Sequence, residues 1–348
     1  MKPIAITLGD PAGIGPEIIV KAFRDAPELT RGCVVIGDLE TLRRASQSLG
    51  RAGQMALPVA LVKSVAAANW VPPRCVPVFQ AIAPLIGVIL GQVGAVAGRA
   101  AGDCVRWAAR AALAGEVAAI VTAPLHKESL AAANFGFPGH TELLQAEAAA
   151  HWNRPVSSLP VRMMLANDEL RTVLVSIHLS LRDAIVAVTF ESVLQTIRIA
   201  HQALSAALGK APRIGVAGLN PHAGEGGLFG TEERDIIAPA TAQARSEGID
   251  ATGPFAPDTV FMRARATTSA PGEFDVVIAM YHDQGLIPVK YLGVDKGVNV
   301  TLGLPLVRTS PDHGTAFDIV GTDRADASSL IAAIRMAKVL AQSASNVA

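Results

Sequence analysis

Three histidines each close a short apolar run of the chain. RTVLVSIH ends at His178, RIGVAGLNPH ends at His222 and DVVIAMYH ends at His282. Open α/β sheets bind ligands beyond the carboxyl ends of their strands, so three imidazoles delivered there can converge on one divalent ion. Each histidine alone could equally cap its strand with a hydrogen bond, but the three together favour a metal site. Imidazole suits zinc, cobalt, iron or nickel better than magnesium.

A second group of polar residues could bind an anion. His140 and Thr141 open a helical pattern in PGHTE, where unpaired backbone N–H groups attract negative charge, although the threonine could simply cap the helix. Lys290, Asn299 and Arg308 follow one another among loops punctuated by Gly and Pro. Two cations and an amide could clamp a phosphate or a carboxylate there, with solvation at the surface as the alternative.

The first apolar run leads directly into the glycine-rich segment GDPAGIGPE, residues 9–17. A turn of this kind between a strand and a helix lets backbone N–H groups approach a ligand, and Pro16 suits the first turn of the helix. The segment lacks the full GxGxxG pattern, so a tight strand-to-helix turn explains it equally well.

The apolar runs identify the elements that must position these groups. They are short, rich in Val and Ile and without polar alternation, as is typical of strands buried on both faces of a largely parallel sheet. They cover residues 3–10, 33–38, 117–124, 171–178, 213–222 and 274–283. Helical patterns cover 98–113, 180–208, 231–246 and 327–341, and the alternation predicts an α/β architecture. The polar segment 153–160, with two prolines, is interpreted as a loop and not as a linker.

Composition narrows the class of protein. The chain has 348 residues, of which 50% are hydrophobic and 17% charged, as expected for a globular protein of about two domains. Lys+Arg and Asp+Glu are 30 each, and this balance argues against nucleic acid as the main partner. Cys33, Cys75 and Cys104 are scattered, which argues against a disulfide framework or a thiolate metal site. The first residues lack the apolar core of a signal peptide, so we expect a cytoplasmic protein.

One uncharged stretch, residues 75–98, could be mistaken for a membrane span. It contains prolines, glycines and glutamines and falls short of about 20 predominantly apolar residues. We therefore expect a buried or interface-covering loop and no membrane partner.

With these residues in view, the sequence resembles the 4-hydroxythreonine-4-phosphate dehydrogenase family of the vitamin B6 pathway. The motifs that carry the resemblance extend over nearly the whole chain: GDPAGIGPE, TAPLHKE, FPGHTE, GLNPHAGEGGLFGTEE, YHDQGLIPVKYLG and GVNVTLGLPLVRTSPDHGTAFDI. The resemblance implies that His178, His222 and His282 hold one zinc, cobalt or magnesium ion. It implies that the substrate is contacted by His140, Thr141, Lys290, Asn299 and Arg308.

The resemblance also implies a fold of two α/β/α domains with a cleft between them, related to isocitrate and isopropylmalate dehydrogenases. The first domain would comprise residues 1–124 with 304–348, on the cofactor side, and the second residues 125–303. The active site would lie in the cleft, at a homodimer interface.

A further similarity concerns the cofactor. HGTAFDIVG, residues 313–321, is similar to the loop that holds the adenosine of NAD in isopropylmalate dehydrogenases. It implies cofactor contacts from His313, Gly314, Thr315, Ala316 and Asp318. Asp318 would accept a hydrogen bond from the ribose 2′-OH and repel a 2′-phosphate, which favours NAD over NADP.

The implied reaction is the NAD-dependent oxidation of 4-phosphooxy-L-threonine at its C3 hydroxyl. The product, 2-amino-3-oxo-4-phosphooxybutanoate, loses CO₂ to give 3-amino-2-oxopropyl phosphate. Lys290, Asp258 and a metal-bound water are the candidates for the general base.

Other functions stay open at this stage. Sister enzymes of the family oxidise 4-phospho-D-threonate, 4-phospho-D-erythronate or cis-dihydrodiols of aromatic acids. Outside the class, the chain could be a metal-dependent protein that binds phosphate esters, or a phosphatase, without redox chemistry. The HGTAFDIVG loop argues against the non-redox alternatives.

Overall fold

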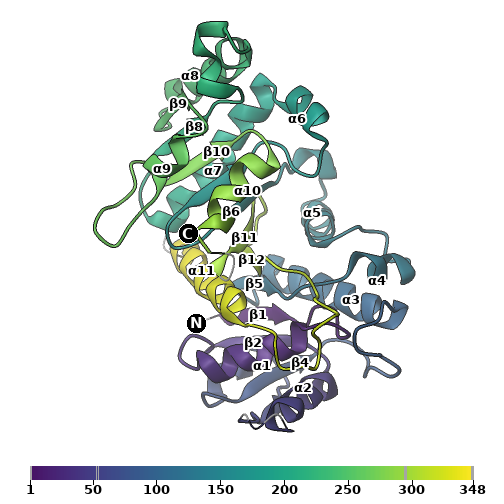
Figure 1. Ribbon diagram of the computed structural model, residues 1–348. Helices are drawn as coiled ribbons and strands as arrows, with labels where there is room; N and C mark the ends of the chain where they lie inside the picture. Colours follow the sequence, from purple (N-terminus) through teal and green to yellow (C-terminus); the bar gives the residue numbers. More distant parts are fainter. Residues whose placement is uncertain (1, 52, 54, 294–295, 346–348) are drawn as a thin grey trace. The chain divides into compact units, whose positions relative to one another are not determined.

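The chain folds into two compact α/β units in a computed structural model, which describes residues 2–51, 53, 55–293 and 296–345 (Figure 1). Unit 1 comprises the chain up to Pro160 together with Leu304–Ala341. Unit 2 comprises Val161–Gly303 and the end of the chain from Gln342. The α/β class predicted from the alternating patterns is confirmed.

The first boundary between the units differs from the expected one at residues 124/125. It lies at Pro160, the end of the segment that the sequence analysis interpreted as a loop and not as a linker. The physical reason is the packing of α4 (Lys127–Ala132) and α5 (His140–His151) on α3 (Ala95–Leu113) within unit 1. Glu147 of α5 forms an ion pair with Arg110 of α3 at 2.8 Å. The second boundary lies at residues 303/304, and the chain from Gln342 is grouped with unit 2.

The strands of unit 1 form a parallel sheet. Their order is β3 (Val59–Leu61), β4 (Val76–Gln80), β2 (Cys33–Gly37), β1 (Ile4–Thr7), β5 (Ala119–Thr122) and β12 (Arg308–Pro311). Every residue of β1, β2 and β5 is buried, in accord with their apolar runs, and the polar residues of β12 are buried as well. The carboxyl ends of these strands therefore share one edge of the sheet.

Unit 2 has a mixed sheet. Its order is β11 (Val298–Leu302), β6 (Arg162–Ala166), β7 (Arg171–Leu174), β10 (Val276–Ala279), β8 (Ile214–Ala217) and β9 (Ala251–Phe255). The strand β6 runs antiparallel to both of its neighbours, whereas β7, β10, β8 and β9 are parallel. Asn167 makes the β6–β7 turn, because its Oδ1 accepts hydrogen bonds from the N–H groups of Glu169 and Leu170 at 2.9 Å.

The remaining helices cover these sheets. Unit 1 also has α1 (Gly15–Asp25), α2 (Leu39–Arg51) and most of α11 (Ser328–Ser345) (Figure 1). A 2.8 Å bond from Thr309 Oγ1 to Ala333 O joins α11 to β12. Unit 2 has α6 (Leu181–Ala187), α7 (Phe190–Leu208), η3 (Pro221–Gly227), η4 (Glu233–Ile237), α8 (Ala238–Ser246), α9 (Val260–Ala264) and α10 (His282–Tyr291).

Two predicted helices are divided in the structure. The pattern over 180–208 gives α6 and α7, because Thr189 and Ser192 form a capping box that starts α7. The pattern over 231–246 begins with the π-helical turn η4 and continues as α8.

Only residues 81–94 of the uncharged stretch form the predicted loop, because the stretch begins with β4 and ends in the first turn of α3, and this loop is not buried within the chain. Ile86 is 85% exposed, Ile89 60% and Leu90 57%. The loop is attached to the glycine-rich segment by a 2.8 Å bond from Gly91 N to Ala12 O. Among the described residues, no helix has the length and apolar character needed to cross a bilayer.

Candidate functional site

The three histidines of unit 2 follow the carboxyl ends of parallel, neighbouring strands. His178 follows β7, His282 follows β10 and His222 follows β8, and these strands lie in the order β7, β10, β8. Parallel strands end at the same edge of a sheet, so the local sequence pattern brings all three to one edge. His178 and His222 have φ angles of 53° and 52°, in the left-handed region that residues other than Gly seldom adopt. Such strain is typical of functional sites.

His178 and His282 lie together. Their ring centroids are 5.7 Å apart and the ring planes make an angle of 42°. Both rings line a pocket of about 290 Å³, with Tyr281 and Asp283 also in its wall. Two imidazoles beside an open pocket can hold an ion and leave coordination positions for other ligands.

The orientation of the His282 ring is set by its neighbour. His282 is the first residue of α10, and its Nδ1 lies 2.7 Å from Oδ1 of Asp283. A carboxylate at Nδ1 favours the tautomer with the proton on that nitrogen, so Nε2 presents its lone pair. This carboxylate–histidine pair is the arrangement usual for metal-binding histidines and supports the fit of the site to an ion.

Two buried polar residues join the strand ends that carry these histidines. Ser176 Oγ donates to Met280 O at 2.9 Å, which joins the end of β7 to the end of β10. Gln284 accepts a 2.6 Å bond from Met280 N and donates a 2.7 Å bond to Gly218 O, which joins β10 to β8. Ser176 is not among the residues predicted from the sequence. A polar residue inside an otherwise apolar strand end was the available signal.

His222 lies in an unusual loop. Residues 222–226 all have positive φ, with values between 42° and 79°. The carboxylate of Glu233 holds this loop, because Oε1 accepts bonds from the N–H groups of Leu219 and Asn220, both at 2.7 Å. Glu233 is 4% exposed, and the sequence analysis missed it. The pair of glutamates in GTEE was its only signal.

The three histidines do not form a preassembled ligand set. Within the described residues, no three His, Cys, Asp or Glu side chains come close enough to make a metal-binding group. The ring of His222 instead lies 6.1 Å from the ring of Phe229. The pair formed by His178 and His282 fits a metal ion that prefers imidazole, and the participation of His222 stays a prediction.

The other candidate residues of unit 2 lie on different elements. Asp258 is exposed in the loop that follows β9. The strand β9 lies next to β8, and the two strands are joined where they end by a 2.7 Å bond from Gly218 N to Phe255 O. Lys290 is in the last turn of α10. Asn299 is in β11. Since α10 rises about 1.5 Å per residue, Lys290 stands about 12 Å along the helix from His282.

In unit 1, Arg308 is a buried cation. It begins β12 and is 4% exposed, and its Nε and Nη2 donate to Thr122 Oγ1 of β5 at 3.1 and 2.8 Å. Burial lowers the pKa of Arg308 to about 10, against an opposing effect of Glu142, so the guanidinium remains charged at neutral pH. The surface alternative considered for Arg308 is therefore wrong.

His140 is a neutral neighbour of this cation. It begins α5, with Thr141 next to it, and its Nε2 is buried and makes no hydrogen bond to the described residues. Burial and the positive charge of Arg308 lower the pKa of His140 well below its usual value, against a backbone hydrogen bond to Ala123. A neutral imidazole with an unused buried nitrogen can bind a polar group of a ligand.

Further buried polar atoms follow β1 and β5. Asp10 Oδ1 accepts a 2.9 Å bond from Ala12 N in the glycine-rich segment, whereas Oδ2 has no hydrogen-bond partner of good geometry among the described residues. The same holds for Nδ1 of His126. Burial raises the pKa of Asp10, although the Ala12 N–H, the Ser129 hydroxyl and the charge of His126 oppose the rise. Asp10, His126 and Ser129 are not among the site residues predicted from the sequence.

The candidate cofactor loop lies against the glycine-rich segment. Ile14 N donates to Thr315 O at 3.0 Å, and a Cβ added at Gly13 would lie 2.9 Å from that oxygen, so only glycine permits this approach. Phe317 stacks on the ring of His126 at 4.7 Å between centroids. Asp318, the residue predicted to bind the ribose, is exposed.

A pocket of about 120 Å³ lies beside this loop. It is lined by Gly13, Glu17, Thr41, Arg44, Leu90, Val320, Gly321 and neighbouring residues.

The candidate residues therefore divide between the units. Unit 1 holds His140, Thr141, Arg308 and the loop of residues 313–318, whereas unit 2 holds the three histidines, Asp258, Lys290 and Asn299.

Comparison with known proteins gives consistent similarities. A family profile described as "Pyridoxal phosphate biosynthetic protein PdxA" matches residues 29–337. A 4-hydroxythreonine-4-phosphate dehydrogenase of Beijerinckia indica is 53% identical over 328 residues, which are 94% of this chain and 92% of the relative. A D-threonate 4-phosphate dehydrogenase of Salmonella typhimurium is 45% identical over 340 residues, which are 98% and 99% of the two chains. The crystal structure of a 4-hydroxythreonine-4-phosphate dehydrogenase from Klebsiella pneumoniae superposes with a TM-score of 0.85 at 42% identity and covers 98% of each chain.

Proposed function

Since the chain belongs to the family of the pyridoxal phosphate biosynthetic protein PdxA, we propose that it is a metal-assisted, NAD-dependent 4-hydroxythreonine-4-phosphate dehydrogenase. The observation that carries the proposal is the 53% identity over 94% of the chain to a relative of that name. The substrate loses a hydride from C3 and the proton of its C3 hydroxyl. The resulting β-keto acid then breaks its C1–C2 bond and releases CO₂, and the electron pair left on C2 takes up a proton.

The residues of unit 2 would hold the ion. His178 and His282 are its first candidates, because their rings lie 5.7 Å apart beside an open pocket, and His222 is the third. When bound, the divalent ion supplies a Lewis acid for the C3 oxygen, and the nicotinamide supplies the hydride acceptor. Asp283 keeps the His282 ring in one tautomer, and Ser176 and Gln284 keep the strand ends in register.

Asp258 is the stronger candidate for the general base. It follows β9 at the same sheet edge as the histidines, whereas Lys290 stands about 12 Å along α10 from His282. A base has to reach the hydroxyl proton within hydrogen-bond distance or through one water. Lys290 and Asn299 are better suited to binding the charged or polar ends of the substrate.

Arg308 would bind the phosphate or carboxylate of the substrate. Its guanidinium is fixed by Thr122 and buried, so it meets an anion without losing much side-chain entropy. His140, held neutral by burial, adds a hydrogen-bonding nitrogen without a second positive charge. Thr141 adds a hydroxyl in the first turn of the same helix, where N–H groups favour anions.

The loop of residues 313–318 would bind the adenosine half of the cofactor. Asp318 is exposed to solvent, so its carboxylate is accessible to the ribose of a bound cofactor. Its negative charge would disfavour the 2′-phosphate of NADP, so NAD is the proposed cofactor and NADP a weaker substitute.

The proposal includes a homodimer in the cytoplasm. Its support is the resemblance to the family and a run of exposed apolar side chains after His178: Leu181 is 60% exposed, Val186 75% and Phe190 40%. A second copy of the chain would cover such a surface. Light scattering coupled to size-exclusion chromatography measures the mass directly.

One alternative substrate has specific support. The relative from Salmonella typhimurium named as a D-threonate 4-phosphate dehydrogenase is 45% identical over 98% of this chain. A panel of 4-phosphooxy-L-threonine, 4-phospho-D-threonate and 4-phospho-D-erythronate, followed at 340 nm with NAD, separates the two. We expect the largest kcat/KM with 4-phosphooxy-L-threonine. A larger value with 4-phospho-D-threonate would assign the alternative, and no reduction of NAD or NADP with any of the three would refute both.

A further inference from the structure

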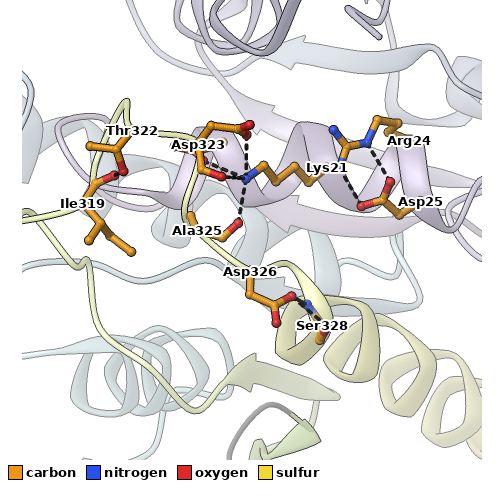
Figure 2. Close-up of polar contacts among 10 residues, drawn as sticks. Lys21, Arg24, Asp25, Ile319, Thr322, Asp323, Ala325, Asp326 and Ser328 are labelled. Carbon is orange, nitrogen blue, oxygen red and sulfur yellow. Dashed lines mark hydrogen bonds and ion pairs between the residues drawn. The ribbon is translucent and has the colours of Figure 1, made fainter. Parts of the chain in front are cut away.

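The loop between β12 and α11 carries all the candidate cofactor residues. It begins at Asp312, whose N–H donates to Ser329 Oγ of α11 at 3.1 Å, so the two ends of the loop meet. Inside the loop, Thr322 Oγ1 donates to Ile319 O at 2.7 Å and forms a tight turn (Figure 2). A loop of this length needs contacts with the rest of the fold to keep one conformation.

A buried lysine of α1 makes such contacts. Lys21 Nζ donates to Asp323 O at 2.9 Å and to Ala325 O at 2.7 Å, and it also pairs with Asp323 Oδ1 at 2.9 Å (Figure 2). On its own helix it pairs with Glu17 Oε1 at 2.9 Å. Lys21 is 5% exposed. An ammonium group at this depth is tolerated only because oxygen atoms surround it.

These contacts hold the backbone of the loop. Two of the four partners are main-chain carbonyls, so the ammonium fixes the path of the chain over residues 323–325. Asp323 has a φ of 64°, a left-handed conformation that costs free energy in a residue other than glycine. The bonds to Lys21 offset that cost.

The same helix holds the other part of the loop. Ile14, directly before α1, donates its N–H to Thr315 O at 3.0 Å. The segment 315–323, which contains exposed Asp318, is therefore held on both sides by α1 and by the residue that precedes it.

We propose that Lys21 is a positioning residue for binding of the nicotinamide cofactor. It acts indirectly, by holding the loop of residues 313–325 in the conformation that binds the cofactor. The inference rests on the proposed function for the identity of the ligand. The ammonium group of Lys21 is bonded to Glu17, Asp323 and Ala325, so it acts on the loop and not on the cofactor itself. A loop ordered before binding loses less entropy when the ligand arrives, so removal of the ammonium should weaken binding and leave the chemistry intact.

The test compares Lys21→Met with the wild type in two measurements. Hydrogen exchange of the ligand-free chain reports the order of the loop, and calorimetric titration with NAD and with ADP-ribose reports binding. We expect faster exchange over residues 316–325 and an increase in both dissociation constants of about tenfold or more, as for the loss of hydrogen bonds to a charged group. We expect kcat at saturating NAD and KM for the phosphorylated substrate to stay within about twofold of the wild type.

Two further variants serve as controls. Arg24→Met removes a cation one turn further along α1, which pairs with Asp25 at 2.6 Å (Figure 2), and should bind NAD as the wild type does. The double variant Glu17→Gln, Lys21→Met removes the carboxylate that Lys21→Met would leave buried and unpaired on the helix, and so provides a second folded chain without the ammonium.

The outcomes are distinguishable. Wild-type affinity for NAD in Lys21→Met or in the double variant would overturn the role of Lys21 and leave the proposed function untouched. An equal rise of exchange in β1 and β5 would overturn that role as well, because the lysine would then stabilise unit 1 as a whole. If the wild-type chain binds neither NAD nor ADP-ribose, the proposed cofactor is wrong and the positioning role falls with it.

Discussion

Asn220 donates from its backbone N–H and from its side-chain amide to the two carboxylate oxygens of Glu233, at 2.7 and 3.0 Å. This bidentate contact lies two residues before His222 and holds a loop in which residues 222–226 all have positive φ. The strain of that loop is balanced by charge-assisted hydrogen bonds to one buried carboxylate. The position of the His222 side chain therefore depends on Glu233.

Glu233→Gln should weaken this loop. A glutamine keeps the shape but turns an amide N–H₂ toward donors, so we expect a loss of about 1–3 kcal/mol in the free energy of unfolding. If His222 contributes to an ion, zinc affinity should fall as well. Denaturant unfolding and zinc titration measure the two effects. Asp235→Asn, an exposed change in the same helical turn, is the matched control and should be neutral in both.

Removal of a ring from the histidine pair should abolish metal-dependent turnover. His282→Ala leaves His178 with at most one other imidazole, so we expect loss of most bound metal, with stability less affected because the side chain is 39% exposed. Metal analysis of purified variants, with activity after chelation and re-addition, is the measurement. Full activity in a demonstrably metal-free wild type would contradict the metal-assisted mechanism. Equal metal content in His222→Ala and the wild type would remove His222 from the site.

Asp318→Ala should change cofactor choice. The loss of a charge-assisted hydrogen bond to the ribose is worth about 1.5–3 kcal/mol, so KM for NAD should rise tenfold or more while discrimination against NADP relaxes. Steady-state kinetics with both cofactors decide the point. Asp168→Ala, an exposed acidic residue in a turn of unit 2, controls for the change in net charge. Unchanged NAD kinetics and NADP preference would exclude Asp318 from the cofactor site.

Arg308→Lys should raise KM for the phosphorylated substrate, although the substitution keeps the positive charge. Lysine keeps the positive charge but loses the planar fork whose Nε and Nη2 both donate to Thr122 Oγ1. The companion variant Thr122→Val removes these two bonds and should have a smaller effect of the same sign. Wild-type kinetics in Arg308→Lys would show that Arg308 supports the fold and not the substrate.

The lowered pKa of His140 predicts that the free energy of unfolding depends on pH. In the unfolded chain this imidazole takes up a proton near pH 6.5, whereas in the folded chain it stays neutral to lower pH. The unfolded state then binds more protons, so the free energy of unfolding falls as pH drops below about 6.5 toward the folded pKa. His140→Gln should flatten the stability profile between about pH 6.5 and 5. A profile parallel to that of the wild type would contradict the neutral assignment.

Local patterns in the sequence determined the α/β class and the edge of the sheet where three histidines follow their strands. Each of these features depends on a short apolar run and on the residue that ends it. A run buried on both faces becomes a parallel strand, and parallel strands deliver their carboxyl ends to one edge. For this reason His178, His222 and His282 could be placed at β7, β8 and β10 from the sequence alone.

Only the tertiary structure decided which polar groups hold these elements in place. Ser176 and Gln284 join neighbouring strand ends, Glu233 holds the loop of His222, and Arg308 is buried against Thr122, a residue 186 positions away. Lys21 and Asp323 are 302 positions apart and meet through one ammonium group. A buried polar side chain takes its partner from whatever the packing of distant segments brings within about 3 Å, and no local periodicity records that meeting.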